Sequence, residues 1–273
     1  MTQNDLKEIK YAKSLLENQS LAMKASDLIG KPIEQGIDQL PINTKTAISK
    51  ATSKALQASL KVATMTMQKK VPTTSSDIIH KLASATSGAS GGLFGIVALP
   101  IELPVSTTII MRSIIDIARS EGEDINLIEA QLACIEVFAL GGPTIDDDAI
   151  DTGYFTVRTM LSNTLGEAAK YISKHGLVNE GAPIIIKLLS EITSRFGLQV
   201  SQKFIVQSVP VIGACSGALF NTIFMDHFQN MAKGHFIIRR LERKYGEDIV
   251  KENYKKMKYE KKSKSPYPPN HHL

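Results

Sequence analysis

Apolar residues recur along this chain mainly at the spacing of an α-helix, and no sustained apolar–polar alternation with hairpin signals appears. Ile110, Ile114 and Ile117 illustrate the pattern, because residues three and four apart lie on one helix face. Another apolar stretch stops at 141–143, a Gly-Gly-Pro sequence typical of a helix end. The pattern predicts helices over residues 4–17, 43–70, 105–119, 126–142, 154–174 and 182–196, and a final helical block over residues 203–246.

The chain is expected to form a single multi-helix, all-α domain. Its 273 residues are enough for a sizeable core, and no linker-like stretch divides it before the C-terminal end. We therefore predict an N-terminal helical extension over residues 1–39, a helical domain over residues 40–248 and a basic, disordered tail over residues 249–273.

Two glycine-rich apolar helical segments are expected at the centre of this domain. Between Lys81 and Arg112 only Glu102 is charged, and no charged residue lies between Lys203 and Asp226. Glycines four residues apart share a helix face, where the absence of side chains lets a neighbouring helix approach closely. The predicted helix-contact glycines are Gly88, Gly91, Gly92, Gly95, Gly213 and Gly217.

The environment of these segments has more than one interpretation. Both reach the length of about 20 residues that a membrane-spanning helix needs. Their composition differs from a lipid-facing helix, since the second holds Gln207, Ser208, Pro210 and Asn221. A buried helical core is therefore favoured, and the alternatives are segments that insert into or lie on a membrane, or two true membrane spans.

Glu102 lies between Pro100 and Pro104. A buried carboxylate without a partner is costly, so Glu102 should bind a cation or have a raised pKa. One interpretation breaks the helix at the two prolines and lets Glu102 cap exposed N–H groups, and the other gives it a ligand- or proton-handling role. The candidates for structural ion pairs are Glu102, Arg112, Asp116, Arg239, Arg240 and Arg243.

A polar cluster near the end of the chain suggests a second kind of site. His227 and His235 are eight residues apart, close to one helix face, and could begin a metal site. Glu102, Glu136 or the acidic residues 146–148 would complete it. The competing interpretation is a polar helix end, at which Arg239, Arg240 and Arg243 pair with Glu102, Glu136 or Asp116.

Few enzyme classes fit the sequence. It contains no His-Glu-x-x-His and no nucleotide-binding glycine loop after a strand. Residues 88–92, Gly-Ala-Ser-Gly-Gly, fit the spacing Gly-x-Ser-x-Gly, but no alternating strand is expected there to hold a nucleophile elbow. We expect a non-enzymatic protein without a cofactor. The alternative is a metal-dependent hydrolase with Glu102, Glu136, His227 and His235 as its candidate catalytic residues and the two histidines as metal ligands.

The positive charge of the chain is concentrated at its C-terminal end. The net charge is +5, and residues 250–273 alone contain seven Lys and two Glu, so the remainder is neutral. An anionic membrane surface attracts such a segment, and a solvated tail is the alternative. Nucleic acid is not expected, because Trp is absent and aromatic residues make up only 6% of the chain. The candidate membrane-surface residues are Lys255, Lys256, Lys258, Lys261, Lys262 and Lys264.

The first 20 residues are polar and charged and lack the order of a signal peptide. Cys134 and Cys215 each lie in an apolar stretch and resemble buried residues of a reducing compartment. We therefore expect a cytoplasmic protein that lies peripherally on the inner face of the cell membrane.

Two stretches resemble the bacterial EcsC protein family. They are "GLFGIVALPIELPVSTTIIMRSIIDIARSEGED", with the following "ACIEVFALGG", and "VPVIGACSGALFNTIFMDHFQNMAKGHFIIRRLERKYG". Matching positions include Glu102, Pro104, Arg112, Glu121, Gly122, Glu136 and Gly141 in the first stretch and Pro210, Gly213, Asn221, His235, Arg239, Arg240, Tyr245 and Gly246 in the second.

The resemblance covers residues 40–250 and leaves the first helix and the lysine tail outside. It implies no catalytic residues. The family is named for a gene beside an ABC-transporter operon, which implies a link to transport or secretion and a membrane protein such as a transporter as a partner. The resemblance also implies that the helix carrying Arg239–Arg243 is the best-placed partner of Glu102.

Overall fold

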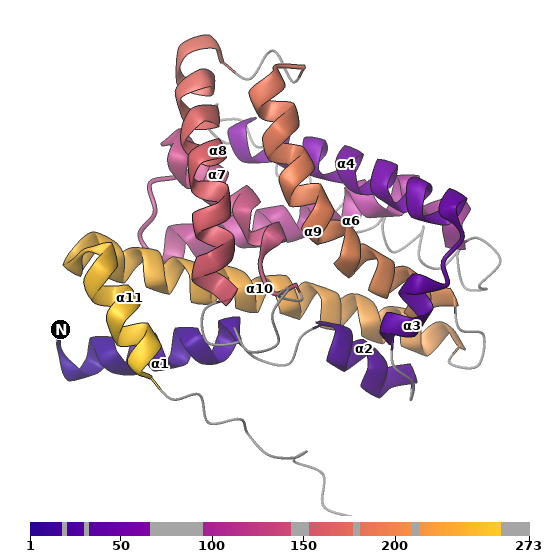
Figure 1. Ribbon diagram of the computed structural model, residues 1–273, viewed down its shortest axis with the longest axis horizontal. Coiled ribbons are helices and arrows are strands. Elements are labelled where there is room, and N and C mark those ends of the chain that lie inside the picture. The colour runs from indigo at the N-terminus through magenta and orange to yellow at the C-terminus, as the bar shows by residue number, and fades with distance from the viewer. Residues whose placement is uncertain are drawn as a thin grey trace, which may run out of the picture.

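The computed structural model describes residues 1–17, 21–29, 33–65, 95–142, 153–176, 181–208 and 213–257. Over these residues the protein consists of ten α-helices and one 3₁₀ helix without strands, which confirms the all-α prediction (Figure 1). The elements are α1 (Gln3–Leu16), α2 (Leu21–Ile29), α3 (Ile33–Asp38), α4 (Ile42–Met65), α6 (Gly95–Ser120), α7 (Ile128–Glu136), η1 (Val137–Ala139), α8 (Gly153–His175), α9 (Pro183–Ser208), α10 (Gly213–Tyr245) and α11 (Glu247–Lys256).

The 33-residue helix α10 runs along the length of the molecule and supports its neighbours (Figure 1). Helices α1, α6 and α11 all pack against it. Helix α6 is parallel to α10, because Gln229 donates to Ser113 (2.9 Å) and Arg239 pairs with Glu123 just beyond the end of α6. Side chains of α10 therefore contact the C-terminal part of α6 and the turn that follows it.

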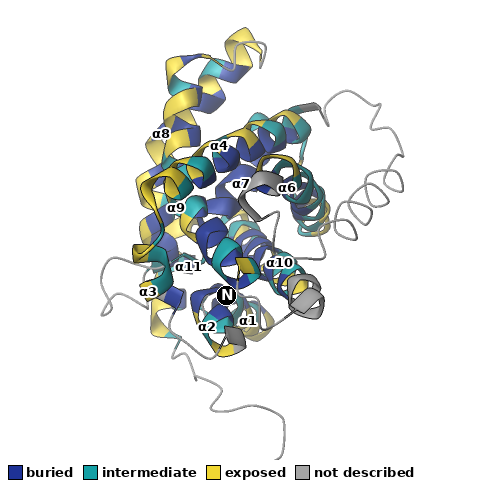
Figure 2. Cartoon of the chain, turned by 90° about the vertical axis from the view of Figure 1, so that its right-hand side faces the viewer, coloured by how far each residue is buried: buried dark blue, intermediate teal, exposed yellow. Residues whose placement is uncertain are grey.

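Phenylalanines from η1, α9 and α10 form the centre of the core. The ring of Phe138 lies 4.9 Å from that of Phe196 and 5.2 Å from that of Phe228, and Phe224 lies 5.1 Å from Phe228. All four side chains are buried, and the buried positions of the surrounding helices face this centre (Figure 2). Aromatic pairs at these distances each add about 0.5–1.5 kcal/mol to the effect of burial.

Helix α9 is longer than its sequence pattern indicates. It continues to Ser208, although the prediction ended this helix at residue 196. Val200 and Val206 are buried, and tertiary packing of this kind carries a helix past a weak position such as Gly197. The predicted block over residues 203–246 is consequently divided between the end of α9 and α10.

Helix α6 is continuous through Pro100 and Pro104, so the prediction that these prolines break it was wrong. Leu99 and Leu103 are buried one turn apart, and their burial favours the helical form. The carbonyl of Pro100 loses its N–H partner at Pro104. Pro100 is an exposed residue, so water can satisfy that carbonyl at little cost.

Gly122 and Gly246 end α6 and α10 in the same way. Their φ angles are +78° and +88°, and each is followed by Glu-Asp-Ile. Glycine adopts this left-handed conformation without steric cost and commonly stops a helix. The turn after α6 carries Glu121 and Glu123 toward α10, and the turn after α10 starts α11.

A glycine lies at the crossing of α1 and α10, although it is not one of the predicted contact glycines. A Cβ atom added to Gly234 would lie 2.6 Å from Leu16 Cγ and 3.0 Å from the carbonyl oxygen of Ala12. The backbones of the two helices therefore approach each other more closely than any residue with a side chain would allow.

The predicted contact glycines belong to segments that the structure covers only in part. Gly88, Gly91 and Gly92 lie outside the described residues, Gly95 and Gly213 are the first residues of α6 and α10, and Gly217 lies in the second turn of α10. The packing role of these six stays a prediction. None of the described helices contains a stretch long and apolar enough to cross a bilayer.

Candidate functional site

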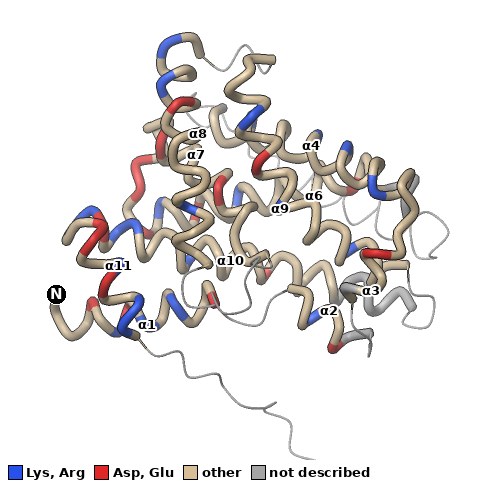
Figure 3. Tube along the Cα trace, viewed as in Figure 1, with Lys and Arg blue, Asp and Glu red and all other residues tan. Residues whose placement is uncertain are grey.

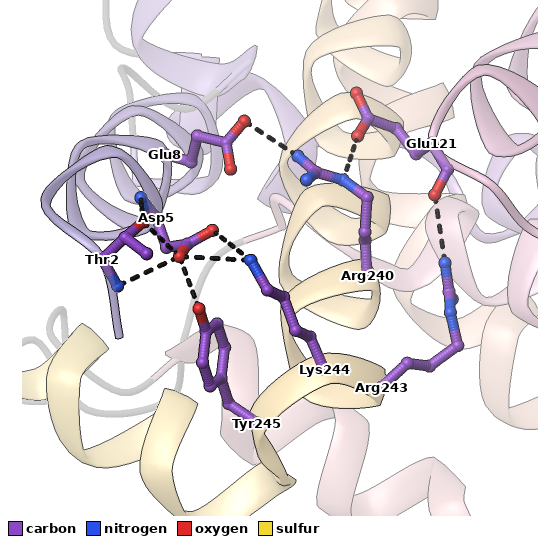
Figure 4. Close-up of polar contacts among 8 residues, drawn as sticks. All are labelled: Thr2, Asp5, Glu8, Glu121, Arg240, Arg243, Lys244 and Tyr245. Carbon is purple, nitrogen blue, oxygen red and sulfur yellow. Dashed lines mark hydrogen bonds and ion pairs between the residues drawn. The ribbon is translucent and has the colours of Figure 1, made fainter.

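A belt of ion pairs joins the C-terminal half of α10 to the turn after α6 and to α1 (Figure 4). Arg240 pairs with Glu121 (2.9 Å) and with Glu8 (3.0 Å). Arg239 and Arg243 both pair with Glu123, and Arg243 also donates to the carbonyl of Glu121 (3.0 Å). Three segments far apart in the sequence are thereby fixed against one another.

Asp5 is the second attachment of α1 to α10. Tyr245 donates its hydroxyl proton to Asp5 (2.6 Å), and the Lys244 ammonium lies 3.2 Å from the same carboxylate. Thr2 and Asp5 also form a capping box at the start of α1. The hydrogen bonds from Thr2 and then Tyr245 hold the pKa of Asp5 well below its usual range, so the carboxylate stays charged in the folded protein.

Five of the six predicted ion-pair residues form ion pairs, but with other partners than expected. The arginines of α10 bind Glu121 and Glu123 instead of Glu102, Glu136 or Asp116. Asp116 pairs with Arg119 at the surface (3.0 Å). The guanidinium Nε of Arg112 is buried and has no hydrogen-bond partner among the described residues.

Glu102 pairs with a lysine, which corrects the expectation of an arginine partner. Its carboxylate lies 2.9 Å from the Lys203 ammonium, and the two side chains are 19% and 2% exposed. Lys203 also lies over the ring of Phe224, 5.2 Å from its centroid. The pair joins α6 to α9, a contact that sequence distance gave no means to predict.

A buried chain of three polar side chains connects α7, α8 and α10. The Tyr154 hydroxyl lies 3.0 Å from His235 Nδ1. On the other side of the same ring, Nε2 lies 3.7 Å from the Glu136 carboxylate. Tyr154, His235 and Glu136 are 6%, 0% and 4% exposed, so we call these residues the buried relay.

Burial keeps the buried relay neutral below about pH 7. Burial raises the pKa of Glu136 to about 7, against the opposing influence of Arg158 and Arg239. Burial lowers the pKa of His235 well below its usual value, and the same two arginines add to this effect. Below about pH 7 the carboxyl group of Glu136 is therefore mostly protonated and the His235 ring is neutral, so their 3.7 Å contact is not an ion pair.

His227 lies in a different environment from His235. A Cβ on Gly141, which has a φ of +70°, would meet the His227 ring at 2.6 Å and the Met231 sulfur at 2.7 Å. Burial lowers the pKa of His227 to about 3. Eight residues of helix separate His227 from His235 by roughly 12 Å along the axis, so the two rings do not share one ion.

The predicted metal site is not assembled by the residues that the structure describes. Within them, no group of three His, Cys, Asp or Glu side chains is placed to hold an ion. Residues 146–148 lie outside the described part. Burial raises the pKa of Cys134 to about 12, so its thiol stays protonated and is a poor nucleophile.

Comparison with models of known protein families shows the family of this chain. The model of the EcsC protein family matches residues 3–241. The chain belongs to the EcsC protein family. Because the EcsC match starts at residue 3, it includes α1, and the expectation that the first helix lies outside the family was wrong. No curated protein and no solved structure matches the chain.

The EcsC motif positions recognised in the sequence gather in the contacts described above. Glu121, Arg239 and Arg240 belong to the ion-pair belt. Tyr245, which lies beyond the matched residues 3–241, extends the belt to Asp5. Glu136 and His235 belong to the buried relay. These motif residues therefore hold helices together, and many residues of the long motif around α10 pack that helix against its neighbours.

Helix α11 lies beyond the EcsC match and carries the first part of the basic segment. Val250 and Tyr254 are fully buried, and the Tyr254 carbonyl accepts a hydrogen bond from Lys13 of α1 (3.3 Å). Lys255 and Lys256 are exposed. The four further candidate lysines, Lys258, Lys261, Lys262 and Lys264, lie outside the described residues.

Proposed function

We propose that this EcsC-family chain is a non-enzymatic, membrane-peripheral helical protein that contacts an anionic membrane surface through its lysine-rich segment, residues 250–273. The observation that carries the proposal is the location of the charge. The segment holds the whole net charge of +5, while the rest of the chain is neutral. A lysine close to an anionic surface contributes about 1 kcal/mol of attraction.

The anchoring of α11 supports this proposal. The Tyr254 ring stacks on Tyr154 at 6.0 Å and meets the edge of Phe155 at 5.1 Å. The start of the segment, residues 250–254, is thus packed against the rest of the protein, while Lys255 and Lys256 are exposed. Attraction of these lysines to a membrane would draw the whole folded domain with them.

The burial and pairing of the polar side chains support a non-enzymatic role. Each member of the buried relay is at most 6% exposed, and the carboxylate of Glu102 is occupied by Lys203. A catalytic acid or base must reach its substrate within hydrogen-bond distance. The contacts of Glu136, His235 and Glu102 are instead those of side chains that join helices.

Vesicle cosedimentation tests the proposal. Phosphatidylcholine vesicles with and without phosphatidylserine are mixed with the full chain at low and at high salt. We expect binding only to the vesicles that contain phosphatidylserine, and a loss of binding at high salt. Replacing Lys255, Lys256, Lys258, Lys261, Lys262 and Lys264 with Gln should weaken binding by about a hundredfold or more.

Three outcomes would contradict the proposal. Absence of binding to anionic vesicles at low salt would remove the membrane surface as the partner. If neither high salt nor the six substitutions weakened binding, another part of the protein would be responsible for the membrane contact. Binding to native membranes but not to protein-free vesicles would point instead to a membrane-protein partner such as a transporter.

A further inference from the structure

Helix α4 carries a line of lysines on its outer face and contains no acidic residue. Its sequence over Ile42–Met65 has four Lys and neither Asp nor Glu. We infer that Lys50, Lys54 and Lys61 form a docking surface for an acidic helix of a protein partner, which lays its carboxylates along this line. The inference goes beyond the proposed function, which concerns the lysine-rich segment at the end of the chain.

Helical spacing places the three lysines on one side of α4. Lys54 follows Lys50 by four residues, and Lys61 follows Lys54 by seven, which is close to two helical turns. All three are exposed, while Ala55 and Leu60 are buried on the inner side of the helix. At 1.5 Å per residue the line extends for about 16 Å along the axis. A partner helix with carboxylates at the same spacing can therefore face all three ammonium groups.

The fold makes no use of these three ammonium groups. None of them forms an ion pair or a hydrogen bond with any residue that the structure describes. Lys45, the fourth lysine of α4, differs from them because it donates to the carbonyl of Asp38 (3.1 Å). Lys50 and Lys54 are four residues apart, a spacing at which two like charges destabilise a helix. The fold therefore carries a repulsion that an anionic partner would relieve.

Exposed lysines of other helices have acidic residues beside them in the sequence. On α8, Glu167 precedes Lys170 by three residues, and on α9, Glu191 follows Lys187 by four. Residues at these spacings are neighbours on a helix surface, so the carboxylate reduces the positive potential around the ammonium group. Along α4 the sign of the charge is uniform, as Figure 3 shows by blue positions without a red one.

The composition of the outer face favours a protein partner over a bilayer. Helix α4 contains no aromatic residue, and its two leucines, Leu56 and Leu60, are buried. The exposed Ile42 is its first residue. A helix that lies in a bilayer interface presents large apolar residues beside its lysines. Ser49 and Gln57 are exposed on α4 instead, so groups that form hydrogen bonds surround the ammonium groups.

The location of α4 leaves its outer face accessible to another protein. Helix α4 packs against α6, α7 and α9, whereas α11 packs against α1 and α10. Figures 1 and 2 show α4 and α1 on opposite sides of α10. A partner helix can therefore lie on α4 without contacting α1 or α11.

A synthetic helical peptide tests the inference. The probe is a fluorescent alanine-based peptide with three Glu at spacings of four and seven residues. The protein is the full chain with the six candidate membrane-surface lysines replaced with Gln, which removes the competing charge of the segment. Anisotropy at low salt should show binding that Lys50→Gln, Lys54→Gln and Lys61→Gln together weaken by about tenfold, the combined effect of three exposed ion pairs. A peptide of the same composition with its Glu on different faces should bind more weakly than the probe, and equal binding of the two peptides would overturn the inference.

A second triple variant is the matched control. Lys170→Gln, Lys174→Gln and Lys187→Gln remove the same charge from exposed positions of α8 and α9 and should leave binding of the probe within about twofold. Equal losses for the two triple variants would overturn the inference. The α4 variant should unfold at no lower urea concentration than its parent, because it removes a repulsion and no contact, so its loss of binding is not a loss of folding.

Cross-linking locates the contact independently. A carbodiimide joins a carboxylate to a lysine amine where the two groups touch, and mass spectrometry identifies the lysine. The probe should be attached mainly to Lys50, Lys54 and Lys61. Attachment mainly to lysines of other helices would refute the inference.

Vesicles distinguish a protein partner from a membrane. The α4 variant in the otherwise unchanged chain should bind phosphatidylserine-containing vesicles as the wild type does. If the α4 substitutions abolished vesicle binding while the six substitutions in the segment did not, α4 would be a membrane-contact surface and the inference would be wrong. If the wild type does not bind vesicles but the probe binds α4, only the proposed function fails, so the two proposals fail in different ways.

Discussion

Replacing Gly234 with alanine would place a methyl group at the crossing of α1 and α10. The new Cβ would lie 2.6 Å from Leu16 Cγ, 3.1 Å from Leu16 Cδ2 and 3.0 Å from the carbonyl oxygen of Ala12. The Leu16 side chain can rotate away. The Ala12 oxygen belongs to the backbone of α1, so it can retreat only if the whole helix shifts.

Two opposing effects determine the magnitude. Alanine is favoured over glycine within a helix by about 1 kcal/mol, and an extra methyl group in a packed interface costs about 1–3 kcal/mol. Gly166 of α8 and Gly197 of α9 are matched controls, because an added Cβ at either position would meet nothing within 4 Å. Gly234→Ala should therefore be about 1–3 kcal/mol less stable than Gly166→Ala, since the difference between the variants cancels the helix preference.

Urea unfolding followed by far-UV circular dichroism measures this difference. Gly166→Ala and Gly197→Ala should unfold at higher urea than the wild type, and Gly234→Ala at a lower concentration than either. Adding Leu16→Ala to Gly234→Ala should not restore the stability of the wild type, because it removes a buried side chain and the contact with the Ala12 oxygen remains. Equal stabilisation by all three Gly→Ala substitutions would show that α1 does not rest against α10 at Gly234.

Two further substitutions test the buried polar groups. Glu136→Gln removes a carboxyl group whose folded pKa of about 7 lies above the ordinary value of 4.5, so this group binds its proton more tightly in the folded state and lowers stability as pH rises through that window. The difference between the two pKa values corresponds to about 3 kcal/mol of stability. In urea unfolding, the stability of the variant relative to the wild type should therefore increase as the pH rises from about 5 to about 8. A constant difference in stability across that range would contradict the reasoning. Lys203→Met leaves the partly exposed Glu102 without its cation and should cost about 1.5–3 kcal/mol, and adding Glu102→Gln should recover most of the loss. A double-mutant cycle with no coupling between Lys203 and Glu102 would show that the pair does not form.

The sequence alone determined the all-α class, the stop at Gly246 and the concentration of charge at the C-terminal end. The helix expected to end at Gly141 ends earlier, at Glu136, and continues as the 3₁₀ helix η1. The class, the stop and the charge are local properties. Helical spacing reports which face of a segment is apolar, and a glycine after an apolar run reports where the helix stops, whatever the segment packs against. The EcsC resemblance was also visible in the sequence, because its motif around α10 is long and nearly continuous.

Only the tertiary structure decided which charged groups meet. Glu102 binds Lys203 because α6 and α9 approach each other there, and the α10 arginines bind Glu121 and Glu123 because the parallel packing of α6 and α10 brings that turn beside them. Gly234 is a single glycine without a repeated spacing, so no pattern distinguishes it from Gly166. Partner choice depends on the register and angle at which distant helices pack, and the periodicity of one helix contains no information about either.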